Sequence, residues 1–423
     1  MKIKIIPKKY EEIMASAPEK HLRPKKPNMF FRTLMKAISI PALASAKFTH
    51  TETGMEKLGK KEPCLYLMNH SAFIDLPIVA GLLYPRPFNI VATTDSFVGK
   101  GWLMRQIGCI PTKKFVLDIG LVRDMQHAVK KLGSSVVMFP EAGYSLDGTA
   151  TTLPDSLGKF VKLLGVPVVM IRTYGAFSRE PLYNGLQKRK VGVNAEMKYL
   201  LSKQEIGEKT PEEINGILAK EFDYDHFKWQ REENIRISEP FRADHLERVL
   251  YKCPHCNAEG KMLGKGITIT CGNCNKSYTL DEYGKLVAEN AKFDCIPSWF
   301  AWQRECVRKE IEQKTYKFFE KVNIFMANDT KHIYSVGSGE LTHTPEGFKL
   351  TSDDGSFEYS QNPQASHSIC ADFYWYEIGD VISIGNQQAL YYCFPKKENV
   401  PVAKVRLAAE EMFKIYKQSR NKA

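Results

Sequence analysis

The stretch Cys64-Leu65-Tyr66-Leu67-Met68-Asn69-His70-Ser71-Ala72-Phe73-Ile74-Asp75 places a short apolar run directly before a polar motif. Such a run is typical of a strand that is buried on both faces, as in parallel sheets. Three similar runs follow at 90–92, 135–139 and 166–171, with helical patterns between them. This alternation predicts an α/β fold with a mixed, mostly parallel sheet. Open sheets of this kind place their chemistry beyond the carboxyl ends of the strands.

The motif after the first strand contains a histidine and an aspartate five residues apart. A histidine at a strand end can act as general base on a hydroxyl, and a carboxylate one turn into the next helix can orient it and stabilise the imidazolium. We therefore predict that His70 and Asp75 form a catalytic pair. A His-x4-Asp spacing also arises often by chance, so the pair alone leaves a structural interpretation open.

Three further motifs accompany this pair in a set order. They are Gly108-Cys109-Ile110-Pro111-Thr112-Lys113-Lys114, Phe139-Pro140-Glu141-Ala142-Gly143-Tyr144-Ser145 and Val166-Pro167-Val168-Val169. In order and spacing, the four motifs resemble the sequence blocks of the glycerolipid acyltransferases, the family of 1-acylglycerol-3-phosphate O-acyltransferase. The resemblance covers roughly residues 60–180, and its first block matches fully while the others match in part.

The resemblance implies a reaction and a role for several residues. It makes His70 the general base, Asp75 its orienting partner, and Glu141 and Gly143 contributors to acceptor binding. The implied reaction is direct attack by the hydroxyl of a lysophospholipid, with 1-acylglycerol-3-phosphate as the first candidate, on an acyl thioester. The donor would be acyl-CoA or acyl carrier protein, and the pathway would be phospholipid biosynthesis.

The third block departs from the family pattern at the position where the family has an arginine. The family has Glu-Gly-Thr-Arg where this chain has Glu141-Ala142-Gly143-Tyr144, so the arginine implied to hold the acceptor phosphate is absent. Lysine can still bind phosphate as a point charge. We expect either that Lys113, Lys114 and Arg172 supply a phosphate site or that the acceptor is a different lysolipid.

Four cysteines farther along the chain have metal-ligand spacing. Cys253-Pro254-His255-Cys256 is followed, after fourteen residues, by Cys271-Gly272-Asn273-Cys274. This pattern is typical of a tetrahedral four-thiolate zinc site of the ribbon type. We predict that the four thiolates bind a structural Zn²⁺ and that His255 is not a ligand.

The first 48 residues combine basic charge with an amphipathic pattern. The chain carries 60 Lys and Arg against 48 Asp and Glu, and the first sixty residues hold 13 against 5. Opposite Arg32 and Lys36, one arc of a helix expected to end at Pro41 carries the apolar side chains Phe30, Phe31, Leu34, Met35 and Ile38. Such a helix suits the interfacial plane of an anionic membrane, although an ordinary helix covering the core has the same pattern.

Composition narrows the location of the chain. With 43% hydrophobic and 26% charged residues and a mean hydropathy of −0.33, the protein is typical of a globular chain with sizeable cores. Its apolar runs fall short of the roughly 18 residues that span a bilayer, and its start, Met1-Lys2-Ile3-Lys4, does not resemble a signal peptide. We expect a cytoplasmic protein, peripheral on the cytosolic face of a membrane.

Changes in composition along the chain predict six segments. They are a basic membrane-associating segment at 1–48, an acyltransferase domain at 49–200, a helical connector at 201–250, a zinc ribbon at 251–280, a helical linker at 281–330 and a β-rich domain with a C-terminal helix at 331–423. The last segment has hairpin turns at Asp354-Gly355 and Gly385-Asn386, and it resembles the pleckstrin-homology-like layout. Helices are expected at about 210–221, 299–325 and 401–417.

Two alternatives from other classes of protein remain open. The chain could be a non-catalytic lipid-binding or scaffold protein that keeps the acyltransferase fold. It could also be a nucleic-acid-binding zinc protein, given its pI near 9.0. Because the basic excess lies far in sequence from the four cysteines, we expect no nucleic-acid partner.

Overall fold

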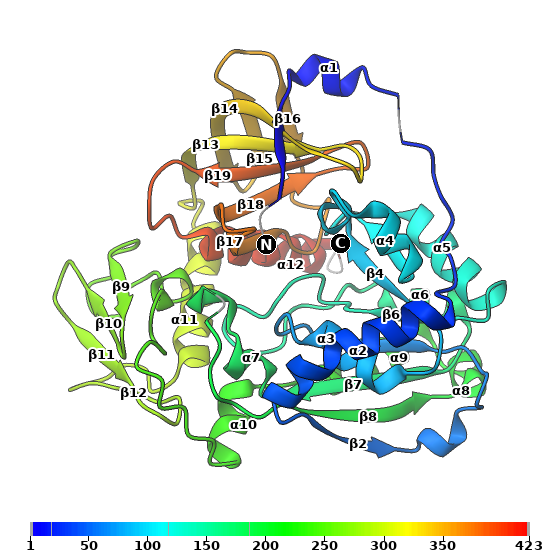
Figure 1. The fold of residues 1–423 in the computed structure, drawn as a ribbon. Coiled ribbons are helices and arrows are strands. Elements are labelled where there is room, and N and C mark those ends of the chain that lie inside the picture. The colour runs from blue at the N-terminus through cyan, green and yellow to red at the C-terminus, as the bar shows by residue number, and fades with distance from the viewer. Residues whose placement is uncertain (1–2, 18, 117, 186, 421–423) are drawn as a thin grey trace.

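The computed structural model describes residues 3–17, 19–116, 118–185 and 187–420. Within these residues the strands form a seven-stranded, a four-stranded and an eight-stranded sheet. Figure 1 shows the eight-stranded sheet at the top, the four-stranded sheet at the left and the seven-stranded sheet at the lower right. None of the helices in the described part of the chain combines the length and apolar character needed to cross a bilayer.

The seven-stranded sheet has the mixed, mostly parallel character predicted from the sequence. Its strand order is β2-β8-β7-β3-β6-β4-β5, and among these neighbours only β7 and β8 are antiparallel. The strands are β2 (Thr49–Thr53), β3 (Leu65–Met68), β4 (Phe88–Thr93), β5 (Cys109–Thr112), β6 (Ser135–Met138), β7 (Val168–Tyr174) and β8 (Asn194–Leu201). The four apolar runs became β3, β4, β6 and β7, so the α/β prediction is confirmed.

Helices cover both faces of this sheet. They are α2 (Met29–Ser45), α3 (Asp75–Leu83), α4 (Gly101–Gln106), α5 (Ile119–Lys130), α6 (Leu157–Leu164), α7 (Ala176–Arg179), α8 (Lys203–Glu208), α9 (Pro211–Glu221) and α10 (His226–Glu232). Tyr66 of β3 joins a core with α2 and α3, whereas its neighbour Leu67 joins a core with α5, α6 and α9. The alternation of side chains along a strand thus gives the sheet one apolar core on each face.

The helix α2 does not end at Pro41, as the sequence analysis expected, but continues to Ser45. A proline inside a helix removes one backbone hydrogen bond. Packing holds the turn beyond Pro41, because Leu43 lies directly against Gly81 of α3. A Cβ added to Gly81 would lie only 2.7 Å from the Cδ1 of Leu43. Tertiary contact therefore outweighs the local effect of the proline.

The β-rich region also contains strands from outside its predicted range. Its order is β16-β15-β14-β13-β19-β18-β17, with β1 (Ile5–Pro7) parallel to β14. The other strands are β13 (Phe318–Ala327), β14 (Ile333–Thr344), β15 (Gly347–Ser352), β16 (Glu358–Gln361), β17 (Cys370–Trp375), β18 (Gly379–Gly385) and β19 (Leu390–Pro395). Both predicted hairpin turns are present, between β15 and β16 and between β18 and β19.

Two predicted boundaries differ in the structure. The helix expected at 299–325 is α11 (Ile296–Glu312), and the chain from Phe318 onward forms β13 because β14 and β19 offer it hydrogen-bond partners on both sides. The segment expected as one unit at 1–48 is divided between β1 in the β-rich sheet, α1 (Tyr10–Met14) and α2 on the α/β unit. Residues 1–2 and 18 of this segment lie outside the described residues.

The remaining elements include a helix that joins the three parts of the molecule. The four-stranded sheet consists of β9 (Met262–Lys265), β10 (Thr268–Cys271), β11 (Ser277–Leu280) and β12 (Leu286–Val287), and the short 3₁₀ helices are Met55–Lys57, Thr94–Phe97, Leu182–Asn184 and Leu246–Arg248. The last helix, α12 (Val402–Arg420), is buried from Val402 to Met412. Figure 1 shows it between the β-rich sheet and the α/β unit.

The contact between α6 and α9 yields a test of the packing. A Cβ on Gly158 of α6 would lie 2.1 Å from the carbonyl oxygen of Pro211, the first residue of α9. We expect Gly158→Ala to lower the free energy of unfolding by about 1–3 kcal/mol, because the two helices must move apart. Chemical denaturation monitored by circular dichroism measures the change.

Gly216 of α9 is the matched control, since a Cβ there meets nothing within 4 Å. Gly216→Ala should leave stability unchanged or raise it by up to about 1 kcal/mol, because alanine has the higher helix propensity. Equal losses in the two variants, or none in either, would contradict this packing.

Candidate active site

The site forms where two neighbouring strands of the seven-stranded sheet end. The strands β3 and β6 are parallel, with Leu65 opposite Val136, so their carboxyl ends meet at one edge. His70 follows β3, and the loop 139–145 follows β6. The buried side chain of Asn69 ties this edge to β7, because its Oδ1 accepts from the backbone N–H of Thr173 at 2.8 Å and its Nδ2 donates to the carbonyl of the same residue at 3.2 Å.

The predicted pair of His70 and Asp75 is in contact. The His70 Nδ1 lies 3.0 Å from Asp75 Oδ2, and this oxygen also accepts the backbone N–H groups of Ser71 at 2.8 Å and Ala72 at 3.1 Å. An ionised aspartate only accepts hydrogen bonds, so Nδ1 carries the proton and Nε2 keeps its lone pair. The imidazole is 20% exposed while the aspartate is buried. The arrangement therefore presents a fixed basic nitrogen.

Two aromatic rings hold the imidazole from the side of the β6 loop. The centroid of His70 lies 4.2 Å from that of Phe139 and 4.1 Å from that of Tyr144. Burial raises the pKa of the Tyr144 phenol well above its usual value, so this side chain stays neutral. Tyr144 also approaches Phe73, at 5.8 Å between centroids.

Glu141 binds the two loops together with both of its carboxylate oxygens. Its Oε2 accepts the backbone N–H of His70 at 2.9 Å, and its Oε1 accepts the N–H and the hydroxyl of Thr151 at 2.8 and 3.0 Å. The hydroxyl of Tyr224 reaches both oxygens, at 2.9 and 3.1 Å. Burial raises the pKa of Glu141, and these hydrogen bonds oppose the shift. The structure thus shows Glu141 holding His70 through the backbone.

A second histidine, which the sequence analysis did not single out, lies behind the pair. His226 is fully buried, and its Nε2 lies 3.0 Å from the hydroxyl of Ser71. Burial lowers its pKa to about 3, so the ring is neutral at physiological pH. It stacks on Phe177 at 5.5 Å. No sequence signal marks this contact, because 155 residues separate the two partners.

The three cations expected at a phosphate site have separate partners. Arg172 Nη2 lies 3.1 Å from the carboxylate of Glu221 in α9. Lys113 donates to the carbonyl of Gln387, and Lys114 lies 4.0 Å from Asp372 Oδ2. Gln387 and Asp372 both belong to the β-rich region. The buried Gly143 is instead approached by another cation, Arg406, whose Nη1 would be 3.8 Å from a Cβ at that position.

The four cysteines of the two Cys-x-x-Cys pairs converge. The sulfur atoms of Cys253, Cys256, Cys271 and Cys274 all lie within 4.8 Å of one another. The Sγ atoms of Cys253 and Cys274, and those of Cys256 and Cys271, are 3.7 Å apart. Metal–sulfur bonds of about 2.3 Å give a tetrahedron with edges of roughly this length. The cluster could therefore hold a metal ion, while His255 bonds instead to the hydroxyl of Tyr278 at 2.8 Å.

Comparison with known proteins finds a family that resembles the part of the chain that carries the site. A model of the Acyltransferase family matches residues 50–173, the segment that contains His70, Asp75, Glu141 and Tyr144. This segment of the chain is similar to the acyltransferase family, and the resemblance to the glycerolipid acyltransferases is confirmed.

Curated relatives carry more particular names. The chain is 31% identical over 127 residues to the chloroplastic 1-acyl-sn-glycerol-3-phosphate acyltransferase BAT2 of Brassica napus, across 29% of this chain and 36% of that protein. It is 29% identical over 127 residues to chloroplastic LPAT1 of Arabidopsis thaliana, across 29% of this chain and 35% of that protein. The chain thus spans about a third of the length of these relatives.

A solved structure of similar description is a more distant neighbour. The 1-acyl-sn-glycerophosphate acyltransferase PlsC of Thermotoga maritima aligns with a TM-score of 0.32 and 17% identity, over 45% of this chain and 78% of that chain.

Proposed function

We propose that the protein is an O-acyltransferase that moves a fatty acyl chain from an acyl thioester to the free hydroxyl of a lysophospholipid. The observation that carries this proposal is the contact between buried Asp75 and His70 at the end of β3. The first candidate acceptor is 1-acylglycerol-3-phosphate, because the curated relatives are named for it. The donor is acyl-CoA or acyl carrier protein, and the product enters phospholipid biosynthesis.

The geometry supports a single displacement at the thioester carbonyl. The Nε2 of His70 accepts the proton of the acceptor hydroxyl as its oxygen forms a bond to the carbonyl carbon. Asp75 keeps the ring in the required tautomer and stabilises the imidazolium that results. The carbon–sulfur bond then breaks, and His70 returns the proton to the leaving thiolate. The products are an ester and a free thiol, and the enzyme is restored.

Substitution of the proposed base tests this mechanism. The full chain is incubated with lysophosphatidate and with acyl-CoA or acylated acyl carrier protein, and release of free thiol is followed. His70→Ala should lower kcat by about 10²–10⁴-fold, because general base catalysis typically contributes this factor. Asp75→Asn should also lower kcat, since an amide can stabilise the wrong tautomer of the imidazole.

His50→Ala is the control, because His50 lies exposed on the edge strand β2 and should leave turnover unchanged. Retained activity in His70→Ala would disprove the role of the base. A wild-type chain that is inert across a panel of lysolipids and both donors would disprove the enzymatic proposal, and vesicle binding in that inert chain would support a lipid-binding scaffold.

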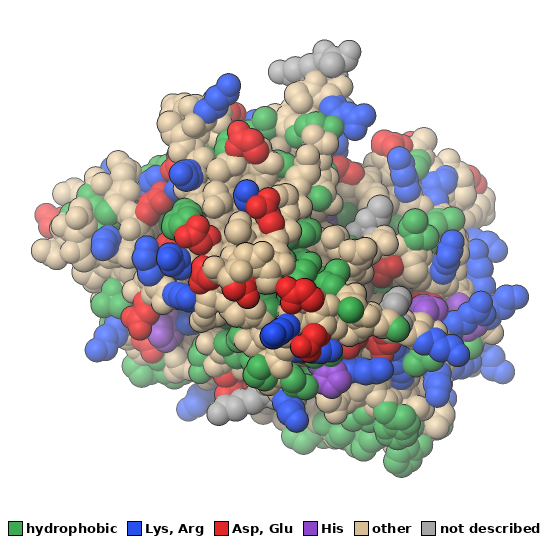
Figure 2. Space-filling model, turned by 90° about the horizontal axis from the view of Figure 1, so that it is seen from above, with side chains coloured by type: hydrophobic (Ala, Val, Ile, Leu, Met, Phe, Trp, Pro, Cys, Tyr) green, Lys and Arg blue, Asp and Glu red, His purple; other side chains and the backbone are tan. Residues whose placement is uncertain are grey.

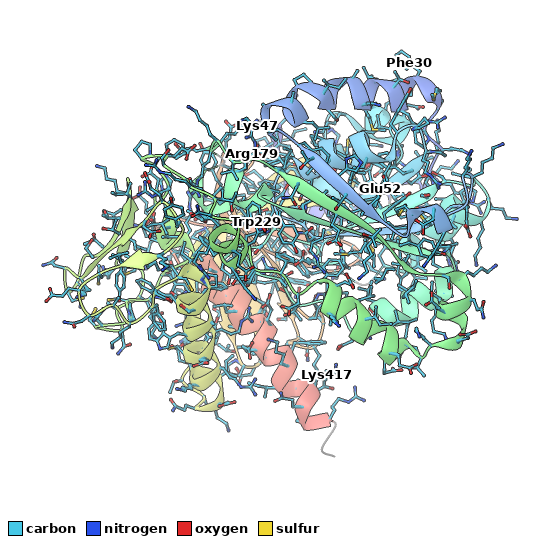
Figure 3. All side chains as sticks on the ribbon, turned by 90° about the horizontal axis from the view of Figure 1, so that it is seen from below. Phe30, Lys47, Glu52, Arg179, Trp229 and Lys417 are labelled. Carbon is cyan, nitrogen blue, oxygen red and sulfur yellow. The ribbon has the colours of Figure 1, made fainter. Side chains whose placement is uncertain are left out.

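We further propose that the protein works on the surface of an anionic membrane, on its cytosolic face. Apolar side chains of α2 and α4 are exposed together: Phe30 is 68% exposed and Trp102 is 69% exposed. The ring of Phe31 meets Trp102 at 6.0 Å, which places the two helices side by side. Figure 3 shows Phe30 at the outer margin of the molecule.

Cations border this apolar surface. They come from the segment before α2 and from α5 with its C-cap residue, and the two are joined by a contact of 3.1 Å between His21 Nε2 and Asp124 Oδ1. Their exposed members are Lys20, Arg23, Lys25, Lys26, Arg123, Lys130 and Lys131. Figure 2 shows a hydrophobic patch at the lower right with Lys and Arg side chains above it. Apolar insertion and attraction to anionic lipid together favour interfacial binding.

Phe73 is the proposed point of entry for the acyl chain. This exposed side chain of the strand-to-helix turn lies beside Tyr144, which in turn contacts His70. An acyl chain that leaves the lipid phase would therefore pass close to the proposed base.

Vesicle flotation tests the membrane proposal. The double variant Phe30→Ser/Trp102→Ser should bind vesicles of phosphatidylglycerol at least tenfold more weakly, because each large side chain contributes on the order of 1.5–3 kcal/mol when buried. Val287→Ser, at an exposed apolar position on the four-stranded sheet, is the control and should bind like the wild type. Unchanged binding of the double variant, or equal binding to neutral phosphatidylcholine vesicles, would contradict the proposal.

We also propose that the four-cysteine cluster holds a structural Zn²⁺. Glu259, which follows the first Cys-x-x-Cys pair, accepts from Lys404 of α12 at 2.8 Å and from Lys252 at 3.0 Å. The contact between Glu259 and Lys404 therefore connects this small module directly to α12. Because folding of small metal modules depends on the metal, its loss should also weaken the contact with α12.

Metal analysis with a cysteine substitution tests this site. Wild-type protein should contain about one zinc per chain, and Cys271→Ser should contain less than half of that and melt several degrees lower. A strong chelator should lower the melting temperature of the wild type in the same way. Cys306→Ser, outside the cluster, should change neither quantity. Metal-free wild-type protein with an unchanged melting temperature would disprove the assignment.

A further inference from the structure

A buried arginine of the last helix reaches the loop that carries Tyr144. The Nη1 of Arg406 in α12 donates to the carbonyl oxygen of Tyr144 at 3.2 Å. The loop belongs to the acyltransferase unit, whereas α12 comes 262 residues later in the chain. The C-terminal helix therefore contacts the polypeptide that holds the ring of His70.

Neighbouring side chains fix the direction of this arginine. The Nε of Arg406 donates to Glu410 Oε1 at 3.1 Å, and Glu410 also accepts from Arg304 of α11 at 2.7 Å and from Ser368 at 2.8 Å. Burial opposes the ionisation of Glu410, yet the two arginines lower its pKa to about 2. Figure 3 shows α11 and α12 side by side, which is the arrangement that brings Arg304 to Glu410.

Arg304, Arg406 and Glu410 line a cavity of about 450 Å³ between α11, α12 and the loop 146–151. Arg304 and Arg406 lie on its helical side. Thr149 and Thr151 lie on the side of the loop. Thr151 is also the residue that donates twice to Glu141, and Glu141 accepts the backbone N–H of His70. The cavity therefore adjoins the residues that position the proposed base.

The carboxylates of the cavity are already engaged by donors. Asp147 accepts from the N–H and hydroxyl of Thr149, and Asp225 accepts from two backbone N–H groups at the start of α10. Glu410 has its two arginines and Ser368. Burial also raises the pKa of Asp147, which reduces the repulsion that an anion would meet.

Donors on the arginines remain available within the part of the chain that the structure describes. Arg406 lines the cavity and is only 6% exposed, and its hydrogen bonds there use Nε and Nη1, which leaves Nη2 for a ligand. Among the described residues, Arg304 donates through Nη1 alone. A guanidinium with free N–H groups in a buried setting matches the several acceptor oxygens of a phosphate better than any neutral group.

We propose that this cavity binds the phosphate of the acceptor and that Arg406 is the residue that recognises it. The inference rests on the proposed function, because it names the head group of that same acceptor. It assigns a role to the β-rich region with its C-terminal helix: this region supplies a binding residue to a site whose base lies in the acyltransferase unit. Arg304 supports Arg406 through their shared partner Glu410.

Binding of sn-glycerol 3-phosphate to the full chain, measured by calorimetry, tests the proposal without turnover. Arg406→Gln should weaken binding at least tenfold, because a charge-assisted hydrogen bond in a buried site is lost. Arg406→Lys keeps the charge but not the planar fork, so its affinity should lie between those of the wild type and Arg406→Gln. Arg308→Gln is the matched control, since Arg308 lies on α11 and pairs with Glu312 and Glu411 outside the cavity.

The control variant should bind like the wild type, and glycerol without phosphate should not bind. Equal affinity of the wild type and Arg406→Gln, or no binding to the wild type, would overturn the proposal.

Kinetics then separate binding of the head group from a merely structural role. In Arg406→Gln the KM for lysophosphatidate should rise at least tenfold while the KM for the acyl donor stays the same. The preference of the wild type for lysophosphatidate over monoacylglycerol, which lacks the phosphate, should shrink by the same factor. An equal loss of kcat with both acceptors would mean that Arg406 only holds the loop, and would refute its role in recognition.

The two proposals fail separately. Binding that depends on Arg406 in a chain that transfers no acyl group would refute the proposed reaction and leave the phosphate site standing. Transfer that ignores Arg406 would refute the phosphate site alone.

Discussion

The rest of the site depends on one carboxylate oxygen. Asp75 Oδ2 accepts a hydrogen bond from the imidazole of His70 and two more from backbone amides of the turn between β3 and α3. The same oxygen therefore shapes the turn and determines which nitrogen of His70 is free. Because β3 and β6 are parallel neighbours, the β6 loop reaches this turn, where Glu141 accepts the backbone N–H of His70 and two aromatic rings contact the imidazole. A geometry suited to base catalysis follows from these few contacts.

Charged networks connect that site to parts of the chain that the acyltransferase family model does not cover. Glu410 joins Arg304 of α11 to Arg406, and Arg406 reaches the loop of Tyr144. Lys404 of the same helix joins Glu259 near the four cysteines. Breaking a buried ion pair leaves an uncompensated charge, which is costly, so these networks oppose separation of the three sheets. The C-terminal helix thus contacts all three parts of the molecule: the four-stranded sheet with its cysteines, the β-rich sheet and the α/β unit.

Local patterns in the sequence predicted much of this structure. Contacts between residues far apart in the sequence could not be predicted from it. The apolar run before Asn69, the helix expected at about 210–221 and the two hairpin turns are read from neighbouring residues, and each is present. Tyr224, His226 and Arg406 reach the site only after the chain has folded, and nothing near them in sequence marks that approach. A long-range contact also explains why α2 continues past Pro41, because Leu43 packs on Gly81 of α3. Arg172 was expected at a phosphate site, but strand alternation places it beside Glu221, while its neighbour Thr173 meets Asn69.

The most direct test of the central claim is a mass-spectrometric product profile of the wild-type chain. The protein is incubated with a mixture of lysophospholipids of different head groups, together with acyl-CoA and acylated acyl carrier protein whose acyl chains are isotope-labelled. The proposed reaction predicts a diacyl phospholipid that carries the label, formed in equal amount to the free thiol, with the phosphatidate product most abundant. Release of labelled fatty acid without ester formation, or no labelled product with any acceptor, would contradict the claim that His70 activates the hydroxyl of a lysophospholipid.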